Sequence, residues 1–599
     1  MKKDNTTVIL IVLIAVIVLA IAGIVVAVVL GTGGGSGTPA EAPTPEPTPY
    51  VDYSNKHIKI TAKDTGYDVY SPLEGSDWGY RYGPSILLND DGTMDAWFAS
   101  PGSGIEFDWF TYRHSSDGGA TWSNEVVVLT PSGGTLDELS VCDPAHMKIG
   151  DYYYLGYTST IDATGGGLCN STFVARSKDI KGPYEHWDGN GWSEASFPIV
   201  YFKGTGNSWG EGEPSFVVLD DVIYVYITFT GYDRTNKMIK YTKVYTADAK
   251  NENWPSTLEY KGCAREYSDG DVDGYTFKDA DSMDVAYVEK YHKFVGICTN
   301  RRFGTESTIV YYESEDGINF TRISELNTNI IAGCHNCGIM KDASGHIKEG
   351  DKMLIGYAYA GGTGSKWGLW ATRFVEIDIT VTDDFDRSDE ASKPLDQGIV
   401  LSQKPENPWM INFMTSTRAY YKTVNSSPFK LNSYAFDNTY KKNIIKDMNN
   451  MQFSDYDENV IKIDGGTVTV VGEGTTYVTI KYNGFTSKSK IVVSPAGATE
   501  KMPHPKIVKA IPTAAEYNVS LNGLQEAFQT RMLAYFENGT FSELYNRAGV
   551  NYKVEVNVAD PSVCTVGNDC IIIPKKVGTT TATVSCEGTS YQININVTE

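Results

Sequence analysis

The chain has few basic residues for its size. Its 599 residues include 51 lysines and arginines against 74 aspartates and glutamates, and the net charge is −23. Binding to phosphate groups requires clustered lysine and arginine side chains. The composition therefore argues against a nucleic-acid partner and against an anionic lipid surface, whereas a neutral polysaccharide or other glycan is compatible with it.

A cleavage signal and a lipid-attachment cysteine are both missing after the long apolar run at the N-terminus. This run, Val8–Leu30, carries no charge and is long enough to cross a bilayer as a helix. Lys2 and Lys3 precede it, and such positive charges stay in the cytoplasm. We therefore predict a cytoplasmic tail over residues 1–7 and a single-pass membrane anchor over residues 8–30. The C-terminal domains are then extracellular on the cell membrane. A helix that polymerises in a pilus-like fibre is the alternative.

A full set of metal-binding cysteines is also absent. Cys334 and Cys337 in "CHNC" have the spacing of half a zinc site, but no second pair has matching spacing, which disfavours zinc. The nine cysteines are an odd number, so at least one is unpaired, and the sequence allows one local bridge near the C-terminus. The three cysteines available for that bridge are Cys564, Cys570 and Cys586.

Amphipathic helices are missing from the central part of the chain, where one pattern recurs five times. After a Gly/Pro-rich linker over residues 31–50, each repeat has an apolar run, a polar turn and a second apolar run, which predicts a β-hairpin. Units of this kind without helices between them indicate a β-propeller. We predict five blades over residues 51–385, with Trp370–Thr380 and the strand near His57 closing the last blade. Ser115–Trp122 fits an Asp box, a structural turn. The repeats start at Gly83, Asp143, Glu213, Asp281 and Cys337.

The last third of the chain changes character after a connector over residues 386–413. Two segments share an Asp-rich turn, a valine-rich strand, a glycine turn and a Thr/Val strand, and they resemble the bacterial immunoglobulin-like group 2 domain. We predict two such β-sandwich domains, at residues 414–495 and 496–599. The second has an insertion, Leu521–Asn538, whose spacing suggests an amphipathic helix. Such domains are spacers or bind cell wall and surface proteins. The predicted fold class is all-β, apart from the N-terminal transmembrane helix.

The innermost strand of each propeller blade starts near the central axis, so the residues just before the five hairpins are expected to share one pocket. Most of them are ionisable. In chain order they are Arg81, Tyr82 and Gly83, then Asp143, then Glu213 with Glu211 close by, then Asp281 or Asp284, and then His335.

This ordered set resembles the five-bladed propeller glycoside hydrolases of family 43 and its relatives. The matching stretches are "DPAHM", "GEPSF", "ARSKDIKGPY" and "CHNCGIM". The resemblance implies that Glu213 is the general acid, that Asp143 tunes its pKa, and that His335 lies beside an axial cation such as calcium. No other cofactor is required. An inverting enzyme of this type also needs a carboxylate base, with roughly 6.5–9.5 Å between the two carboxyl groups.

The first blade departs from the family pattern, because Gly83 stands where the family has its aspartate base. Asp77 is one candidate to replace it, and Asp281 or Asp284 is another. Without a base, the site would bind sugar and not cleave it. The residues expected to contact substrate are Arg81, Tyr82, Trp78, Trp209 and Glu211.

The sequence thus predicts a surface-anchored glycoside hydrolase of a prokaryote that acts on polysaccharide. A lectin-like adhesin without catalysis is the first alternative. A sialidase is the second, since "YRYGPSI" followed by an Asp box is how a sialidase begins, although sialidases have six blades and an arginine triad.

The predicted topology can be tested on intact cells. Protease added from outside is expected to remove everything beyond the linker at residues 31–50, because the positive charges before Val8 hold the N-terminus inside. Immunoblotting against the C-terminal domain measures the loss, and permeabilised cells serve as the control. A C-terminal domain that resists protease until the cells are opened would contradict the outward orientation.

Overall fold

The computed structural model of the chain contains one compact unit, Tyr53–Glu599, beyond the N-terminal segment. In the described residues no helix is long and apolar enough to cross a membrane, and the anchor predicted over residues 8–30 lies outside them, as does the linker at residues 31–50. The structure describes residues 51–599 except 73–79, 103–105, 133–134, 161–166, 207, 265–280, 306, 327, 360–369, 384–409, 416–418, 432, 438–441, 445–447, 498–506, 513, 523–525, 537–540, 545–553, 568–569 and 587.

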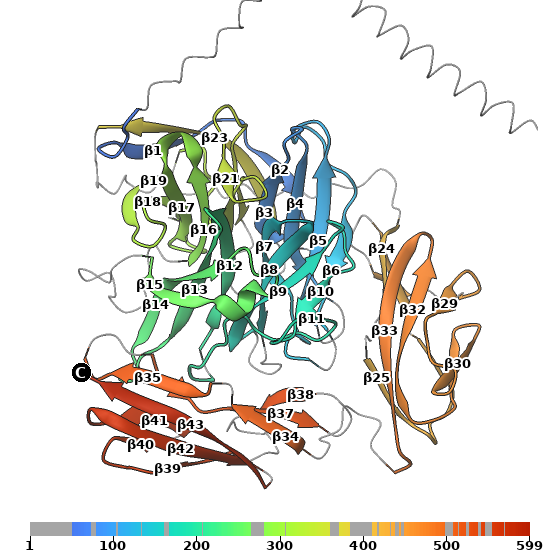
Figure 1. Ribbon diagram of the computed structural model, residues 1–599. Helices are drawn as coiled ribbons and strands as arrows, with labels where there is room; N and C mark the ends of the chain where they lie inside the picture. Colours follow the sequence, from blue (N-terminus) through green and yellow to red (C-terminus); the bar gives the residue numbers. More distant parts are fainter. Residues whose placement is uncertain are drawn as a thin grey trace, which may run out of the picture. The chain divides into compact units, whose positions relative to one another are not determined.

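The described part of the chain is built almost wholly of β-strands, and its first half forms a propeller of five blades, as predicted (Figure 1). The innermost strands of consecutive blades pack against one another in a closed ring, in the order β3, β7, β12, β16, β20 and back to β3. The ring brings five segments that are far apart in the sequence to one axis.

Each blade is an antiparallel sheet, and short connections of two to five residues join many of its strands. Blade I contains β3 (Tyr82–Leu88), β4 (Met94–Pro101), β5 (Asp108–Ser115) and β6 (Val126–Leu129). Blade II contains β7 (Cys142–Ile149), β8 (Tyr152–Thr160), β9 (Asn170–Ser177), β10 (Glu185–Trp187) and β11 (Trp192–Ser193). Blade III contains β12 (Gly210–Leu219), β13 (Val222–Tyr232), β14 (Met238–Asp248) and β15 (Glu259–Cys263), with a 3-10 turn at Trp254–Thr257.

The last two blades follow the same plan. Blade IV contains β16 (Asp281–Val288), β17 (Lys293–Asn300), β18 (Thr308–Ser314) and β19 (Thr321–Leu326), with a 3-10 turn at Glu289–Tyr291 and the short β21 (His346–Ile347) added in parallel to β16. Blade V contains β20 (Cys337–Ile339), β22 (Leu354–Tyr359), β23 (Ala371–Thr382) and, from the start of the propeller, β1 (His57–Ala62) and β2 (Tyr67–Tyr70).

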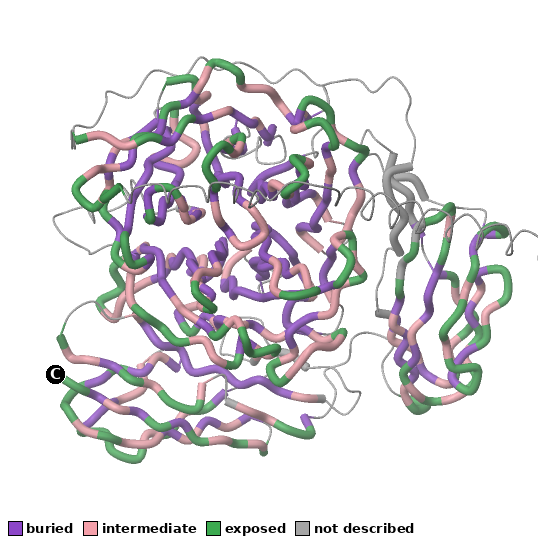
Figure 2. The backbone as a smooth tube through the Cα atoms, turned by 45° about the horizontal axis from the view of Figure 1, so that its top comes forward, coloured by how far each residue is buried: buried purple, intermediate pink, exposed green. Residues whose placement is uncertain are grey.

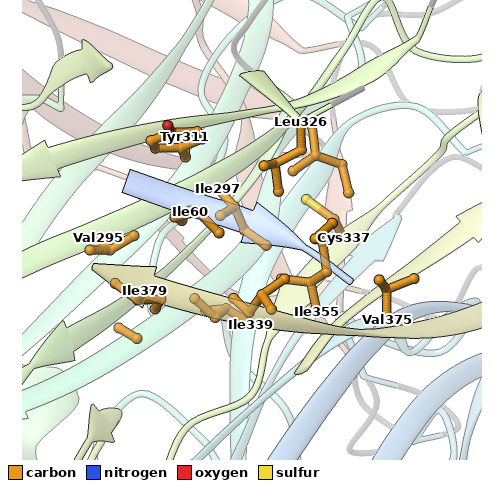
Figure 3. Close-up of a cluster of buried hydrophobic side chains, with 14 of the residues drawn as sticks. Ile60, Val295, Ile297, Tyr311, Leu326, Cys337, Ile339, Ile355, Val375 and Ile379 are labelled. Atoms are coloured by element: carbon orange, nitrogen blue, oxygen red, sulfur yellow. The ribbon is translucent and has the colours of Figure 1, made fainter. Parts of the chain in front are cut away.

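The first strand of the propeller closes its last blade. β1 pairs antiparallel with β23 from His57 opposite Thr382 to Ala62 opposite Ile377. Figure 3 shows the buried cluster between blades IV and V, where Ile60 of β1 packs with Ile297 and Ile339. The expected closure is confirmed, and it removes the free sheet edges that an open ring would expose.

Burial follows the distance from the axis. The inner strands of the blades are buried almost throughout, whereas the exposed residues gather at the turns and outer edges (Figure 2). The Asp box at Ser115–Trp122 is one such turn: Asp117 accepts hydrogen bonds from Thr121 N and Oγ1 at 2.8 and 2.6 Å. These bonds lower the pKa of Asp117 to about 2. The box therefore stabilises a hairpin, as expected.

The two C-terminal domains share one strand order. In the first, the three sheets are β24-β27-β28, β25-β33-β32-β29 and β26-β31-β30, and in the second they are β34-β37-β38, β35-β43-β42-β39 and β36-β41-β40. The first contains β24 (Met410–Thr415), β25 (Ala419–Thr423), β26 (Phe429–Lys430), β27 (Ser433–Asp437), β28 (Lys442–Ile444), β29 (Gln452–Ser454), β30 (Ile461–Asp464), β31 (Thr467–Val470), β32 (Gly474–Tyr482) and β33 (Phe485–Ser494). The second contains β34 (Ile507–Pro512), β35 (Glu516–Ser520), β36 (Phe528–Gln529), β37 (Met532–Phe536), β38 (Phe541–Leu544), β39 (Glu555–Val558), β40 (Cys564–Val566), β41 (Ile571–Pro574), β42 (Gly578–Cys586) and β43 (Thr589–Thr598).

The helix predicted within Leu521–Asn538 is wrong. This stretch contains strands β36 and β37, which correspond to β26 and β27 of the first domain. It is therefore part of the repeated plan and not an insertion, and its apolar spacing reflects two short strands around a turn. The first strand of the first domain also begins at Met410, four residues before the predicted boundary at 414. That the domains are immunoglobulin-like remains a prediction.

The second C-terminal domain contacts the propeller through buried polar groups. Arg531, which is 1% exposed, donates to the carbonyl oxygens of Phe202 and Gly204, just before β12. Lys243 of β14 is buried between two carboxylates, Glu211 of β12 and Glu526 of the C-terminal domain. The role of this domain as a spacer, expected from the sequence, does not account for these contacts.

The thiols near the C-terminus lie in different surroundings. Cys564 is a free thiol in one buried cluster, whereas Cys570 and Cys586 share another. Cys334 and Cys337 are buried free thiols. Among the residues that can be described, no group of three or more His, Cys, Asp or Glu side chains is arranged to hold a metal ion.

The ion triad at Lys243 gives a prediction for stability. Lys243→Met leaves Glu211 buried without its cation, and loss of one partner of a buried pair costs about 3–5 kcal/mol. Lys488→Met is the matched control, because its pair with Glu194 is about half exposed and is worth about 0–1 kcal/mol. Urea denaturation followed by tryptophan fluorescence compares the two variants. Equal midpoints would show that the triad does not stabilise the fold.

Candidate active site at the propeller axis

Four of the five inner strands enter the axis through the same unusual backbone conformation. Gly83, Asp143, Glu213 and Ser282 have φ angles of 58°, 55°, 53° and 53°, in the left-handed region. Each is followed within two residues by a shift in the register of its strand pair. For a residue other than glycine this conformation is strained, and such strain is typically found at functional sites. The repeated bulge turns one residue of each blade toward the axis.

These residues line one small pocket. It has about 310 Å³ of empty space, counting solvent at its mouth. Blades I to V contribute Gly83, Asp143, Glu213, Ser282 and Asn336 at equivalent positions. The expected convergence of the five blades is therefore observed, although blades IV and V present Ser282 and Asn336 where the sequence predicted Asp281 or Asp284 and His335.

Two carboxyl groups in the pocket share one amide. The side-chain nitrogen of Asn336 donates to Asp143 Oδ1 at 3.1 Å and to Glu213 Oε1 at 3.2 Å. Because both acceptor oxygens lie on the same nitrogen, they can be no farther apart than the sum of these two distances. All three side chains are buried, with Asp143 the most exposed at 8%. The pair is thus held at a fixed distance in a site with little water.

Burial and the neighbouring charge of Glu213 raise the pKa of Asp143 to about 8. Glu213 has surroundings that favour its charged form: Ser282 N donates to Oε2 at 3.0 Å, and the guanidinium of Arg302 lies 3.9 Å from Oε1. Two carboxyl groups this close do not both ionise readily. The geometry therefore favours a protonated Asp143 beside an ionised Glu213 near neutral pH.

Asp284 lines the same pocket, but its carboxylate is bound by other protein groups. Lys341 Nζ lies 2.6 Å from its Oδ1, Ser215 Oγ donates to the same oxygen at 2.6 Å, and Ile339 N donates to Oδ2 at 2.8 Å. These partners come from blades III and V, so Asp284 ties three blades together. We assign it a structural role in place of the predicted role as base.

Two predicted substrate contacts are bound elsewhere. Arg81 is 2% exposed and forms a two-pronged pair with Glu125, with its Nε 2.6 Å from Oε1 and its second nitrogen 3.1 Å from Oε2. This buried pair with Glu125 does not fit the predicted contact of Arg81 with substrate. Glu211 is bound by Lys243 and does not line the pocket.

The other residues predicted to contact substrate differ in how far the structure describes them. Tyr82 is buried next to the pocket, where its ring stacks on His335 with 4.8 Å between the centroids. Trp209 lies directly before β12, is partly exposed, and accepts hydrogen bonds at its carbonyl from Asn170. Asp77 and Trp78 lie outside the described residues, and the side chain of Asp281 is not described. A base from Asp77 or Asp281 remains a prediction.

His335 does not face the pocket as a ligand for a cation. It is 1% exposed, and Arg302 donates from Nε to its Nδ1 at 3.0 Å and places a second nitrogen 3.3 Å from its Nε2. Burial and the charges of Arg302 and Lys240 hold the pKa of His335 well below its usual value. A positive guanidinium that donates to one ring nitrogen and lies against the imidazole repels a metal ion. The residues therefore do not fit the axial calcium implied by the sequence resemblance.

Sequence reasoning missed Asn336, Ser282 and Arg302. In blades I to III the inward residue directly precedes a proline, which marks its position, but Met283 and Cys337 stand at that place in blades IV and V. Counting the same offset from the following apolar run would have found Ser282 and Asn336. Arg302 belongs to the loop between β17 and β18, and no sequence pattern relates it to the other blades.

Comparison with known proteins gives distant structural neighbours only. No protein-family model and no curated protein sequence matches the chain. A family 117 glycoside hydrolase of the marine bacterium Zobellia galactanivorans is 15% identical, with 54% of this chain and 90% of that chain covered and a TM-score of 0.36. A GH43_1 enzyme from Xanthomonas citri is 12% identical, with 54% and 97% covered and a TM-score of 0.38. An α-L-arabinofuranosidase from Podospora anserina is 11% identical, with 52% and 95% covered and a TM-score of 0.36. Likenesses this distant carry no argument about function.

The raised pKa of Asp143 predicts how stability depends on pH. The carboxyl binds its proton more tightly in the folded protein than in the unfolded chain, so stability is lost as pH rises from about 4 to about 8. Asp143→Asn cannot ionise and is expected to remove this loss, which for one group is at most about 1.4 kcal/mol per pH unit. Thermal melts of Tyr53–Glu599 across this range measure it, with the exposed Asp151→Asn as control. A slope that Asp143→Asn leaves unchanged would contradict the assignment.

Proposed function

We propose that the protein is a surface-anchored glycoside hydrolase that cleaves glycans in the axial pocket of its propeller. The observation that carries the proposal is the pair Asp143 and Glu213, two buried carboxyl groups joined by Asn336 and poised in different charge states. Hydrolysis of a glycosidic bond requires one carboxylic acid to protonate the leaving oxygen and one carboxylate to act on the sugar. The anchored, outward topology predicted from residues 8–30 completes the proposal.

The charges around the pair assign a role to each carboxyl group. Asp143 carries the proton and donates it to the oxygen of the scissile bond. Glu213 is the carboxylate that attacks the anomeric carbon, and the Asn336 amide nitrogen joins its oxygen to Asp143. The sum of those two hydrogen-bond distances is the upper limit for the gap between the two oxygens, and it is below the roughly 6.5–9.5 Å that an inverting enzyme keeps for water. The pair is therefore closer to the spacing of a retaining enzyme, at roughly 5–5.5 Å.

In the second half of this reaction Asp143, now ionised, takes a proton from water as the water hydrolyses the bond between the sugar and Glu213. This assignment reverses the roles that the sequence resemblance implied, where Glu213 is the acid and Asp143 tunes it. It also makes a third carboxylate in blade I unnecessary, so Gly83 is compatible with catalysis.

A lectin-like adhesin is the alternative function. It is favoured by Gly83, because the family pattern places an aspartate base at that position, and by the small volume of the pocket. The sialidase alternative has no such support, since the propeller has five blades and Arg81 is bound to Glu125 in place of a substrate carboxylate.

Leaving-group dependence distinguishes the two role assignments. If Asp143 donates the proton, Asp143→Asn lowers kcat by about 10²–10⁴-fold on natural glycans and much less on an aryl glycoside whose leaving group needs no proton. Glu213→Gln is expected to abolish turnover on both kinds of substrate, because the attacking carboxylate is gone. Hydrolysis is measured on a panel of plant and microbial polysaccharides and on aryl glycosides.

The stereochemistry of the first product and a binding assay complete this experiment. Retention at the anomeric carbon, seen by proton NMR, is expected. The opposite pattern, in which Glu213→Gln alone is rescued by an activated leaving group, would restore the roles implied by the resemblance. If the wild-type protein binds glycans on an array and cleaves none of them, the protein is a lectin and the hydrolase proposal fails.

A further inference from the structure

His335 sits in an aromatic cage near the catalytic pair. Its ring centroid lies 4.8 Å from that of Tyr82, 4.6 Å from Trp370 and 5.2 Å from Phe303. The side chain is 1% exposed, and its backbone N–H donates to Ala358 O of blade V at 2.9 Å. The imidazole is therefore fixed in position by three rings, which orients both of its nitrogens.

Arg302 donates to one of these nitrogens and lies close to the other, and its guanidinium also reaches toward the catalytic pair. Arg302 Nε donates to His335 Nδ1 at 3.0 Å, a second guanidinium nitrogen lies 3.3 Å from Nε2, and Nη1 lies 3.9 Å from Glu213 Oε1. The guanidinium lies over the ring of Phe303, 4.6 Å from its centroid. The side chain is 22% exposed, so the charge is partly desolvated and its attraction for Glu213 is stronger than at an open surface.

An arginine in this position supplies the positive charge that a divalent cation would supply. A guanidinium is planar, carries a permanent positive charge because its pKa is above 12, and offers its donors in a fixed fork. A calcium ion requires six to eight oxygen ligands, whereas the neighbours of His335 are aromatic rings and a cation. The same place therefore cannot hold both.

We propose that Arg302 is the internal cation of this site, a positioning residue whose guanidinium holds His335 and Glu213 in place of a metal ion. The proposal rests on the hydrolase function argued above. Arg302 does not touch the bond that is cleaved. It acts through Glu213, whose ionised form it favours; its charge also lowers the pKa of Asp143, which burial nevertheless keeps raised.

Two charged groups face Glu213 through contacts that can be described. Asp143 faces it from blade II and disfavours its ionisation, and Arg302 faces it from blade IV and favours it. Asp284 and Lys341, also at the axis, form a pair whose charges cancel. His335 stays neutral because burial and the charges of Arg302 and Lys240 lower its pKa. Removal of Arg302 therefore takes away a positive charge that lies 3.9 Å from Glu213.

The test uses the full chain and three variants. Arg302→Gln removes the charge and is expected to lower kcat by about 10²-fold with little change in KM. It is also expected to move the acid limb of the pH profile to higher pH, because Glu213 is then protonated more easily. Arg302→Lys keeps the positive charge, so the acid limb of its pH profile is expected to stay close to that of the wild type. Arg301→Gln controls for the loss of an arginine from the same loop.

A calcium titration tests the same inference without hydrolysis. Wild-type protein is expected to bind no calcium that depends on His335, as measured by calorimetry with His335→Ala as reference, and its activity should be unchanged by chelation with EDTA. Calcium binding that His335→Ala abolishes would overturn the inference even if no glycan is cleaved. An acid limb that Arg302→Gln leaves in place would overturn it as well. Absence of hydrolysis in the wild type, with no such calcium binding, would refute the hydrolase function and leave Arg302 as the cation of a binding site.

Discussion

The amide of Asn336 is the contact on which the proposed chemistry depends, because it holds two acidic side chains from different blades at one distance. Two carboxyl groups left to themselves in a buried pocket would repel one another when ionised. The side-chain nitrogen of Asn336 donates to both carboxyl groups, and one proton held by the pair leaves a single negative charge, which reduces the repulsion. Asp143 and Glu213 can therefore stay close, with one carrying the proton and the other the charge.

The propeller makes that contact possible by closing a ring of five strands. Each of the first four inner strands bends inward at a residue with a left-handed φ, a conformation that costs on the order of 1–3 kcal/mol for residues other than glycine. The strain is offset by the sheets around it, including the blade that β1 completes. A rigid ring of this kind positions functional side chains more accurately than loops do.

Partners, and not residue types, decide what each acidic side chain at the axis does. Asp284 accepts hydrogen bonds from Ser215, from Ile339 N and from the buried Lys341 and ties blades together, whereas burial outweighs the hydrogen bonds of Asp143 and keeps its pKa raised. Glu211, two residues before Glu213, is bound by Lys243 in a triad that includes Glu526 of the C-terminal domain. That domain thus stabilises the strand that carries Glu213, a role beyond that of a spacer.

Local sequence patterns were sufficient to predict the all-β class, the five blades and the closing strand near His57. They also located Asp143 and Glu213. The reason is that a hairpin, or a residue directly before a proline at the start of a strand, is recognised from neighbouring residues alone. Such patterns failed at Leu521–Asn538, where two short strands mimic helical spacing. They also placed Arg81 and Glu211 at the pocket, although Glu125 and Lys243 hold them elsewhere. Only the tertiary structure decided that Asn336 joins the pair and that Arg302 lies at His335. Those contacts join residues 123 and 33 positions apart, and no pattern of neighbouring residues encodes them.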